Sequence, residues 1–250
     1  MPHVDLNSDL GESFGAWSMG DDAAMLPLVT SANLACGFHA GDATVMLDAC
    51  RTAVEQGVAI GAHPSYRDRA GFGRRDMEVA PDDLYAELLY QVSALAGIAR
   101  SAGGSVGYVK PHGALYNRIA VDPTAADVVA EAAATLALPV LGPPTSAIEA
   151  ACARAGVPFF REGFADRAYL ADGTLAARGL PDAVLTDPDQ VARRAERMVT
   201  ESEVTALDGS TVSLKIDSLC VHGDTEGAIT LARAVREALT SAGVTLAAFS

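Results

Sequence analysis

Long apolar runs and a recognisable leader are missing from this sequence, and each absence excludes a class of protein. No segment approaches the roughly 20 uninterrupted apolar residues of a membrane-spanning helix. The opening residues, MPHVDLNSDLGE, lack the basic and then apolar order of a signal peptide. We therefore expect a cytoplasmic protein that does not associate with membranes.

Positive charge is also scarce. The formal net charge is −14, and the densest basic stretch, Ala192–Arg197, has the pattern of a solvated helix face. Nucleic-acid binding draws on clustered Lys and Arg, so neither DNA nor RNA is an expected partner. A small anionic substrate remains compatible with the sequence, because a local pocket can be positive in an acidic protein.

Disulfide and phosphate-loop motifs are absent as well. The cysteines are widely spaced and form no CxxC pair, so we expect reduced thiols at Cys36, Cys50, Cys152 and Cys220. Neither GxxxxGK[ST] nor GxGxxG occurs, so a nucleotide must be held without a familiar phosphate loop or by another chain. Aromatic residues make up only 6% of the chain, so the core must be built from many small contacts.

What the sequence does contain is an alternation of short apolar runs and longer helical stretches. The predicted strands are Val4–Asn7, Asn33–Cys36, Val58–Ala62, Val106–Val109, Pro139–Leu141, Val157–Phe160 and Ser218–His222. A strand followed by a helix, repeated along the chain, is typical of a parallel sheet covered by helices. About seven such units favour one α/β domain over residues 1–250, built as a closed or nearly closed TIM-like (β/α) barrel.

Capping residues mark several of the helices. Pro81 fits the first turn of a helix that Gly103 stops, and Asp187 fits an N-cap. A last helix is expected from about Thr225 to Ala242. The segment Thr205–Leu214 breaks the rhythm, because its Asp-Gly pair between β-prone runs predicts a hairpin.

Four of the five histidines follow short apolar strands and are flanked by small residues. In a parallel barrel all strand C-termini open on the same face, where active sites are built. One His at a strand end is more often structural, but four in parallel settings favour a functional site. We therefore expect four histidines to lie together at the mouth of the barrel, where the strands have their C-terminal ends: His39, His63, His112 and His222.

Other polar residues should join this mouth. The first strand places Asp5 and Asn7 on the same side, and Asp9 and Glu12 follow in the loop at its end. Lys110 comes directly after another apolar strand. Because buried lysines are rare unless they are paired, we interpret Lys110 as functional.

A later segment, REGFADRAY, adds Glu162, Asp166 and Arg167 after the strand that ends near Phe160. Arg167 is equally suited to a structural ion pair. Asp42 and Asp224 follow His39 and His222 closely, but an Asp in this setting is better suited to capping the next helix.

Asp, Asn and His gathered at a barrel mouth could also hold a divalent metal ion. The ligand candidates are Asp5, His39 and His63. No local ligand motif such as HExxH supports this interpretation.

Taken in order, five motifs resemble the LamB/YcsF family: DLNSDLGESFG, SANLACGFHAGD, GAHPSYRDRAGFGRR, VKPHGALYN, and EGFADRAY followed by DGTL. The resemblance extends from Asp5 to about Asp224 and covers nearly the whole chain. It implies a distorted (β/α) barrel similar to the glycoside hydrolase/deacetylase group. It also implies one subunit of a bacterial ATP-dependent 5-oxoprolinase, which opens the lactam of 5-oxo-L-proline to L-glutamate and hydrolyses ATP, with Mg²⁺, to ADP and phosphate. The implied partners are 5-oxoprolinase subunits B and C.

The resemblance carries no settled catalytic assignment, so the roles follow from chemistry. A lactam carbonyl is a poor electrophile, and its phosphorylation needs cations near the oxygen and a base that directs water. Lys110 and Arg167 would stabilise the negative charge, and Asp9 or Glu12 would be the general base. The three histidines His39, His63 and His112 would position water, transfer protons or bind a metal ion. The expected substrate-binding residues are Asn7, Glu162, Arg167 and His222.

Two other functions remain open at this point. A stand-alone metal-dependent amidohydrolase or deacetylase would hold a metal and act without ATP or partners. A non-catalytic substrate-binding subunit would bind the substrate while the chemistry takes place in a partner chain. The sequence also leaves the oligomeric state open, and the chain could form a homo-oligomer. It does not identify the subunit that binds ATP.

Overall fold

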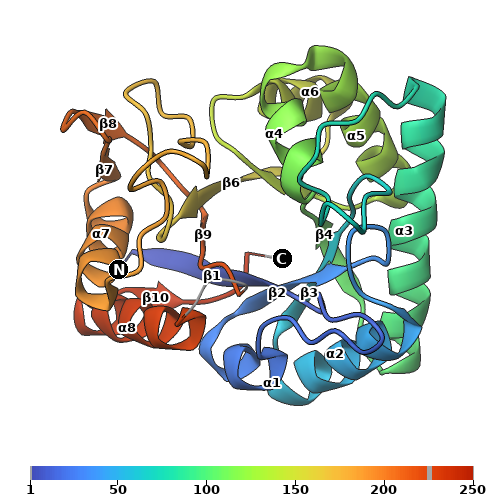
Figure 1. Cartoon of the computed structure of the whole chain (residues 1–250), viewed down its shortest axis with the longest axis horizontal. Coiled ribbons are helices and arrows are strands. Elements are labelled where there is room, and N and C mark those ends of the chain that lie inside the picture. The colour runs from blue at the N-terminus through green and yellow to red at the C-terminus, as the bar shows by residue number, and fades with distance from the viewer. Residues whose placement is uncertain (1, 224–226, 250) are drawn as a thin grey trace.

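Seven parallel strands form a closed ring in the computed structural model, which describes residues 2–223 and 227–249 (Figure 1). The ring closes because β9 pairs with both β6 and β1. Its strands, in order around the ring, are β1 (His3–Leu10), β2 (Ser31–Ala35), β3 (Ala59–His63), β4 (Val106–Val109), β5 (Val140–Gly142), β6 (Phe159–Phe164) and β9 (Ser218–Cys220). The predicted parallel barrel is therefore confirmed.

Helices surround the barrel on its outer side (Figure 1). They are α1 (Asp22–Met25), the 3-10 helix η1 (Leu26–Leu28), α2 (Ala43–Gln56), α3 (Pro81–Ser101), α4 (Gly113–Val121), α5 (Pro123–Leu136), α6 (Ala147–Ala155), α7 (Pro188–Thr200) and α8 (Ala228–Ser241). Within the described residues, no helix combines the length and the apolar character needed to cross a bilayer.

Among the described residues, three short strands lie outside the closed ring. The predicted hairpin is confirmed, because β7 (Glu203–Thr205) and β8 (Thr211–Ser213) pair antiparallel. The strand β10 (Thr245–Leu246), which the sequence analysis did not predict, pairs in parallel with the beginning of β1.

The predicted helix boundaries agree with the structure where it describes them. The side chain of Asp187 accepts a hydrogen bond from the Gln190 amide at 2.7 Å and caps α7, and α3 begins at Pro81. Asp42 likewise caps α2. The expected start of the last helix at Thr225 and the suggested cap Asp224 lie outside the described residues.

Small apolar side chains pack the layer between the barrel and its helices. Helix α5 shows this most clearly, because its buried face consists of alanines and valines that pack against α3, α4 and α6. On β1, Val4, Leu6 and Leu10 belong to the largest buried cluster. This apolar layer excludes water from the outer face of the ring strands. Polar side chains can therefore occupy the inner face.

The interior of the barrel is polar. Asp5, Asn7 and Asp9 occupy alternate positions on β1, and their side chains bond to residues of neighbouring strands. Asn7 donates to Ser218 at 2.7 Å and accepts from Asn33 at 2.7 Å. TIM-barrel interiors are usually filled by branched apolar side chains. Here side-chain hydrogen bonds cross-link the strands, as buried polar groups require.

Gly61 on β3 provides the space that the polar interior needs. Tyr108 on β4 lies against this glycine, and its hydroxyl donates to Asn33 at 2.6 Å. A Cβ atom at Gly61 would overlap the Tyr108 ring. The ring is completely buried, so it cannot move aside without breaking its hydrogen bond.

Replacing Gly61 with alanine should therefore destabilise the fold. We expect Gly61→Ala to lower the free energy of unfolding by about 1–3 kcal/mol, the usual cost of overpacking a core. The matched control is Gly97→Ala in α3, where a Cβ meets nothing within 4 Å. That change should raise stability by about 0.5–1 kcal/mol, since alanine favours helix. Urea unfolding of both variants tests this, and equal effects of the two changes would contradict it.

Candidate active site

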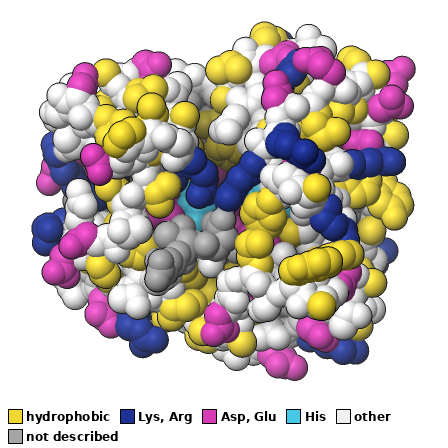
Figure 2. Space-filling view, viewed as in Figure 1, with side chains coloured by type: hydrophobic (Ala, Val, Ile, Leu, Met, Phe, Trp, Pro, Cys, Tyr) yellow, Lys and Arg dark blue, Asp and Glu magenta, His cyan; other side chains and the backbone are white. Residues whose placement is uncertain are grey.

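The residues predicted for the mouth come from the C-terminal ends of five ring strands and the loops that follow them. They are Asp9 and Glu12 at β1, His39 after β2, His63 at the end of β3, Lys110 and His112 after β4, and His222 after β9. All are buried. Figure 2 shows histidine at the bottom of a hollow in this face, with Lys and Arg side chains on both sides.

The histidine-bearing loops meet because glycine lets them approach closely. Gly73 has a φ of 64°, and a Cβ there would lie 2.8 Å from the His39 Cβ and 2.9 Å from the His112 Cδ2. The carbonyl of Gly73 also accepts from the Ala114 amide at 2.8 Å. The segment after β3 is thereby tied to the start of α4, directly beside both imidazoles.

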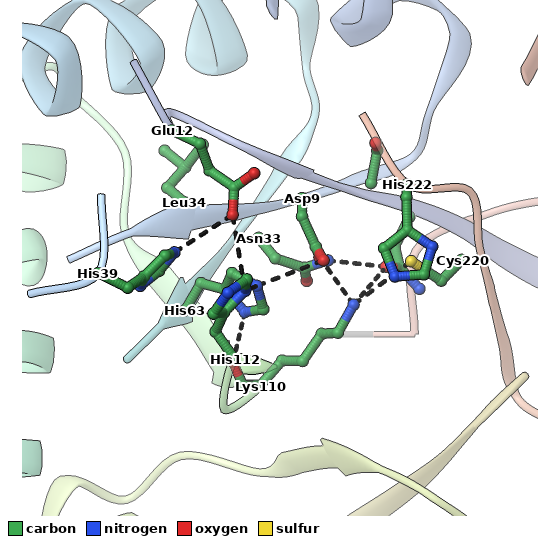
Figure 3. A network of polar contacts seen from close by, with 12 residues as sticks. Asp9, Glu12, Asn33, Leu34, His39, His63, Lys110, His112, Cys220 and His222 are labelled. Carbon is green, nitrogen blue, oxygen red and sulfur yellow. Dashed lines mark hydrogen bonds and ion pairs between the residues drawn. The ribbon is translucent and has the colours of Figure 1, made fainter. Parts of the chain in front are cut away.

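Lys110 lies between the carboxylates of Asp9 and Glu162 inside the mouth. Figure 3 shows its side chain reaching toward Asp9. Its Nζ is 2.8 Å from Asp9 Oδ1 and 2.8 Å from Glu162 Oε1. Burial acts to lower the pKa of Lys110, but the charges of Asp9 and Glu162 outweigh it, and the pKa is well above its usual value. Burial likewise acts to raise the pKa of Asp9, but His63 and Lys110 hold it well below the usual range. Lysine and aspartate are therefore both charged at neutral pH.

Three imidazoles and one carboxylate form a second group beside Asp9 (Figure 3). The rings of His39 and His112 stack with centroids 3.9 Å apart, and His63 meets His112 edge-on at 4.8 Å. Glu12 Oε1 lies 3.2 Å from His39 Nε2 and 3.6 Å from His112 Nδ1. Ligand-type atoms of these four residues all lie within 4.8 Å of one another, so the group has the composition and size to hold a metal ion.

Burial keeps two of these imidazoles uncharged. It lowers the pKa of His39 and of His112 well below the usual range, and the neighbouring His63 adds to the effect on both. Neutral imidazole is the form that accepts protons and binds metals.

His222 lies on the other side of Lys110 and pairs with Asp166, a residue that the sequence analysis noticed but left without a role. His222 Nδ1 is 2.9 Å from Asp166 Oδ2. Burial acts to raise the pKa of Asp166, but the His222 charge lowers it below the usual range. The motif EGFADRAY contains Asp166, but no pattern in the sequence shows that this loop folds back onto β9.

Arg167 does not face the mouth as a free cation. Its guanidinium donates to the carbonyl of Ala176 at 2.6 Å and to that of Ala183 at 3.4 Å. Burial, together with the charge of Arg178, lowers the pKa of Arg167 to about 10. The structure therefore places Arg167 as a brace of the loop between β6 and α7, and its predicted contact with substrate is not supported by this position.

Asp5 lies away from the two histidines with which the sequence analysis grouped it. Its carboxylate accepts from Thr30, Ser31 and Ser218 inside the barrel. The correction has a simple cause, because strand alternation places Asp5 and Asp9 on one face but separates them by about 13 Å along β1 at ~3.3 Å per residue. Asn7, between them, supports the floor of the site through Ser218 and Asn33.

The four cysteines are free, as expected from their spacing, and all four are buried. Burial raises the pKa of the Cys36 thiol to about 12 and that of Cys220 well above its usual value. Neither is a thiolate at neutral pH, so neither has the character of a nucleophile.

Comparison with known proteins places these residues in a wider group. The model of the LamB/YcsF family matches residues 4–250. A protein from Paracidovorax citrulli (strain AAC00-1), named as the A subunit of 5-oxoprolinase, is 57% identical, over 99% of this chain and 100% of its own length. The lactam utilization protein from Thermus thermophilus has a TM-score of 0.94 and 46% identity, over 99% of this chain and 100% of that one.

A more distant likeness concerns the fold alone. A family 4 carbohydrate esterase from Streptomyces lividans superposes with a TM-score of 0.50 and 11% identity, over 100% of this chain and 93% of that one. The expected deacetylase-like barrel is thus confirmed.

The ion pairs of Lys110 with Asp9 and Glu162 should contribute to the free energy of unfolding. Lys110→Met leaves two neighbouring carboxylates buried without their cation, so we expect a loss of about 3–5 kcal/mol in the free energy of unfolding. Adding Glu162→Gln should recover part of this loss by removing one charge. The chain has one other lysine, Lys215, which is exposed, and Lys215→Met should change stability by less than about 0.5 kcal/mol.

Urea unfolding at pH 7 measures these differences. The ion pair stabilises the fold between the unfolded pKa of Asp, about 3.9, and that of Lys, about 10.4. Its contribution is lost as the pH falls through the lowered pKa of Asp9 or rises through the raised pKa of Lys110. A Lys110→Met variant as stable as Lys215→Met would contradict the role of Lys110 in the fold.

Proposed function

This chain belongs to the LamB/YcsF family, and we propose that it is a subunit of an ATP-dependent 5-oxoprolinase. The reaction opens the lactam of 5-oxo-L-proline to L-glutamate and hydrolyses ATP, with Mg²⁺, to ADP and phosphate. The observation that carries the proposal is the 57% identity to the 5-oxoprolinase protein of Paracidovorax citrulli, which extends over 99% of this chain. That match therefore includes the strands that supply the site. The word subunit in the relative's name implies partner chains, which we propose to be subunits B and C.

The chemistry of the mouth suits this reaction. Transfer of the γ-phosphoryl group of ATP to the lactam oxygen releases ADP and makes the carbonyl carbon a better electrophile. Water can then add and the ring C–N bond can break to leave an acyl phosphate, which a second water hydrolyses to L-glutamate and phosphate. The phosphoryl group carries negative charge through these steps, and a fixed cation stabilises it. Lys110 is that cation, because its ammonium is charged and already held by Asp9 and Glu162.

Asp9 is the general base in this proposal. Its Oδ1 accepts from Lys110 and from Asn33, each at 2.8 Å, while its Oδ2 faces His63 at 3.4 Å. Oδ2 is thus the oxygen available to a water molecule. The low pKa of Asp9 keeps it ionised, and it accepts the proton as water adds to the carbon.

His222 supplies the proton that the ring nitrogen needs as it leaves. Its Nδ1 is held by Asp166, which leaves Nε2 on the opposite edge of the ring, and a small part of the residue reaches the surface of the mouth. A buried carboxylate behind an imidazole fixes its orientation and stabilises its protonated form. Asp166 is therefore a positioning residue, and His222 is the group that meets the substrate.

The first experiment measures glutamate release from 5-oxo-L-proline by this chain alone and mixed with subunits B and C, with and without ATP. We expect release only in the complete mixture with ATP. Asp9→Asn should lower that rate by at least about 100-fold, as loss of a general base does. Asp48→Asn, an exposed change on α2, should leave it unchanged. Full activity of a folded Asp9→Asn variant would contradict the assignment of Asp9 as the general base.

The role of Asp166 is tested by steady-state kinetics. In Asp166→Asn the imidazole loses the carboxylate that orients it, so we expect kcat to fall by about 100-fold or more with little change in KM. The control is Asp182→Asn, an exposed residue in the same loop, which should leave both parameters unchanged. A rise in KM as large as the loss in kcat, or a lower melting temperature, would indicate a structural role only.

A second candidate function is a metal-dependent amidohydrolase or deacetylase that needs neither ATP nor partners. The cluster of Glu12 with His39, His63 and His112 favours it, because zinc hydrolases use such ligands. ATP-independent release of glutamate, or hydrolysis of other amides by this chain alone, would select this function.

A further inference from the structure

The hydrogen bonds around His63 and His112 fix which ring nitrogens carry protons. His63 Nδ1 lies 2.6 Å from the carbonyl oxygen of Lys110, and His112 Nε2 lies 2.8 Å from that of Phe72. A carbonyl oxygen only accepts hydrogen bonds, so each of these nitrogens is the N–H donor. In the neutral rings, His63 Nε2 and His112 Nδ1 are therefore both bare lone pairs.

These two lone pairs face each other. His63 Nε2 and His112 Nδ1 are 3.0 Å apart, a hydrogen-bond distance with no hydrogen to share when both rings are neutral. Further acceptors surround them, because Glu12 Oε1 is 3.6 Å from His112 Nδ1 and Asp9 Oδ2 is 3.4 Å from His63 Nε2. Converging acceptors repel one another unless a cation lies among them.

His39 brings one more nitrogen atom toward these acceptors. Its Nε2 faces Glu12 Oε1 at 3.2 Å, and its Nδ1 is buried without a hydrogen-bond partner. A neutral ring carries only one proton. If Nε2 carries it, Nδ1 is an unsatisfied acceptor, and if Nδ1 carries it, Nε2 is one more lone pair aimed at a carboxylate. A cation bound at Nε2 relieves the second arrangement.

Three of the separations among these atoms are close to those between the ligands of a four-coordinate zinc ion, and the whole group lies within 4.8 Å. Zinc bonds of about 2.0–2.1 Å to nitrogen or oxygen place tetrahedral ligands about 3.3 Å from one another. The separations here are 3.0 Å between His63 and His112, 3.2 Å between His39 and Glu12, and 3.6 Å between His112 and Glu12. Acceptor atoms without a shared hydrogen rarely lie so close to one another, whereas ligands of one ion do.

The surroundings hold the rings as metal ligands are usually held. Metal-binding histidines donate their other N–H to a carbonyl or carboxylate, which fixes the tautomer and the ring orientation. Lys110 and Phe72 supply these carbonyls here. Phe72 does so from a φ of 54°, a conformation that is rare for a bulky residue and typical of functional sites.

We propose that Glu12, His39, His63 and His112 form a binding site for one tetrahedral divalent transition-metal ion, of which Zn²⁺ is the best match. Three imidazoles and a carboxylate favour Zn²⁺ or Co²⁺ over Mg²⁺ and Ca²⁺, which prefer oxygen ligands. When bound, the ion would supply Lewis-acid chemistry beside Asp9. Binding itself needs neither ATP nor other chains, so this proposal and the proposed 5-oxoprolinase activity can fail separately.

The test measures metal binding directly. The full-length chain is freed of metal with a chelator, titrated with Zn²⁺ and, separately, with Co²⁺, and analysed for bound metal by mass spectrometry. We expect one ion per chain, the visible absorption of tetrahedral Co²⁺, and a rise in melting temperature with Zn²⁺ that Mg²⁺ does not reproduce.

The variants compare matched histidines and test the carboxylate. His112→Gln and Glu12→Gln should weaken Zn²⁺ binding by at least about 100-fold, since even outer residues of metal sites contribute 10–100-fold. His3→Gln, at the exposed beginning of β1, should bind as the unchanged chain does. If a site variant fails to fold, the titration of the unchanged chain still decides the question.

Two results would overturn the proposal. One is the absence of stoichiometric Zn²⁺ or Co²⁺ binding to the unchanged chain. The other is binding that His112→Gln and Glu12→Gln leave intact, which would place the ion elsewhere. Metal binding without glutamate release in the complete mixture would support this site while removing the 5-oxoprolinase function. ATP-dependent glutamate release by a chain that binds no metal would support the 5-oxoprolinase function and remove the metal site.

Discussion

The ion pair of Lys110 with Asp9 and Glu162 is the constraint on which the site depends. An ammonium group removed from water loses much of its hydration, and only close carboxylates and good geometry offset that loss. Here both carboxylates lie 2.8 Å from Nζ, and they come from β1 and β6, which are separated by β9, whereas Lys110 follows β4 across the ring. The pair therefore ties distant strands together, and it can form only when the barrel is closed.

The polar interior of the barrel follows from this pair. Asn7 and Asn33 bond to each other and to Asp9 or Lys110, and Tyr108 on β4 fixes Asn33 on β2 by reaching across β3. Each buried polar group needs a hydrogen-bond partner. A charged residue at the mouth is therefore accompanied by hydrogen-bonded amide and hydroxyl groups deeper in the barrel. The small apolar residues are left to the outer layer, where they pack the helices onto the strands. Stability and chemistry are thus separated onto the two faces of the same sheet.

The mouth itself contains two electrostatically different halves that meet at Asp9. On one side, Lys110 carries its positive charge beside Asp9, and Asp166 holds the His222 ring. On the other, His39 and His112 are kept neutral by burial and lie with Glu12 around a common centre. Asp9 contacts both, through Oδ1 to Lys110 and through Oδ2 to His63. Any reaction at this mouth must take place within reach of that carboxylate.

The sequence by itself determined the barrel and most of the residues at its mouth. Short apolar runs between helical stretches indicate parallel strands, and parallel strands bring their C-terminal residues to one face, so the histidines and Lys110 could be placed without coordinates. Three features depended on the tertiary structure. Asp5 lies too far down its strand to join the histidines, Arg167 is held by backbone carbonyls, and Asp166 reaches His222 through a loop without regular structure. Periodicity fixes which side of a strand a residue occupies, but depth in the barrel, the path of a loop and the partner of a buried charge arise only from packing.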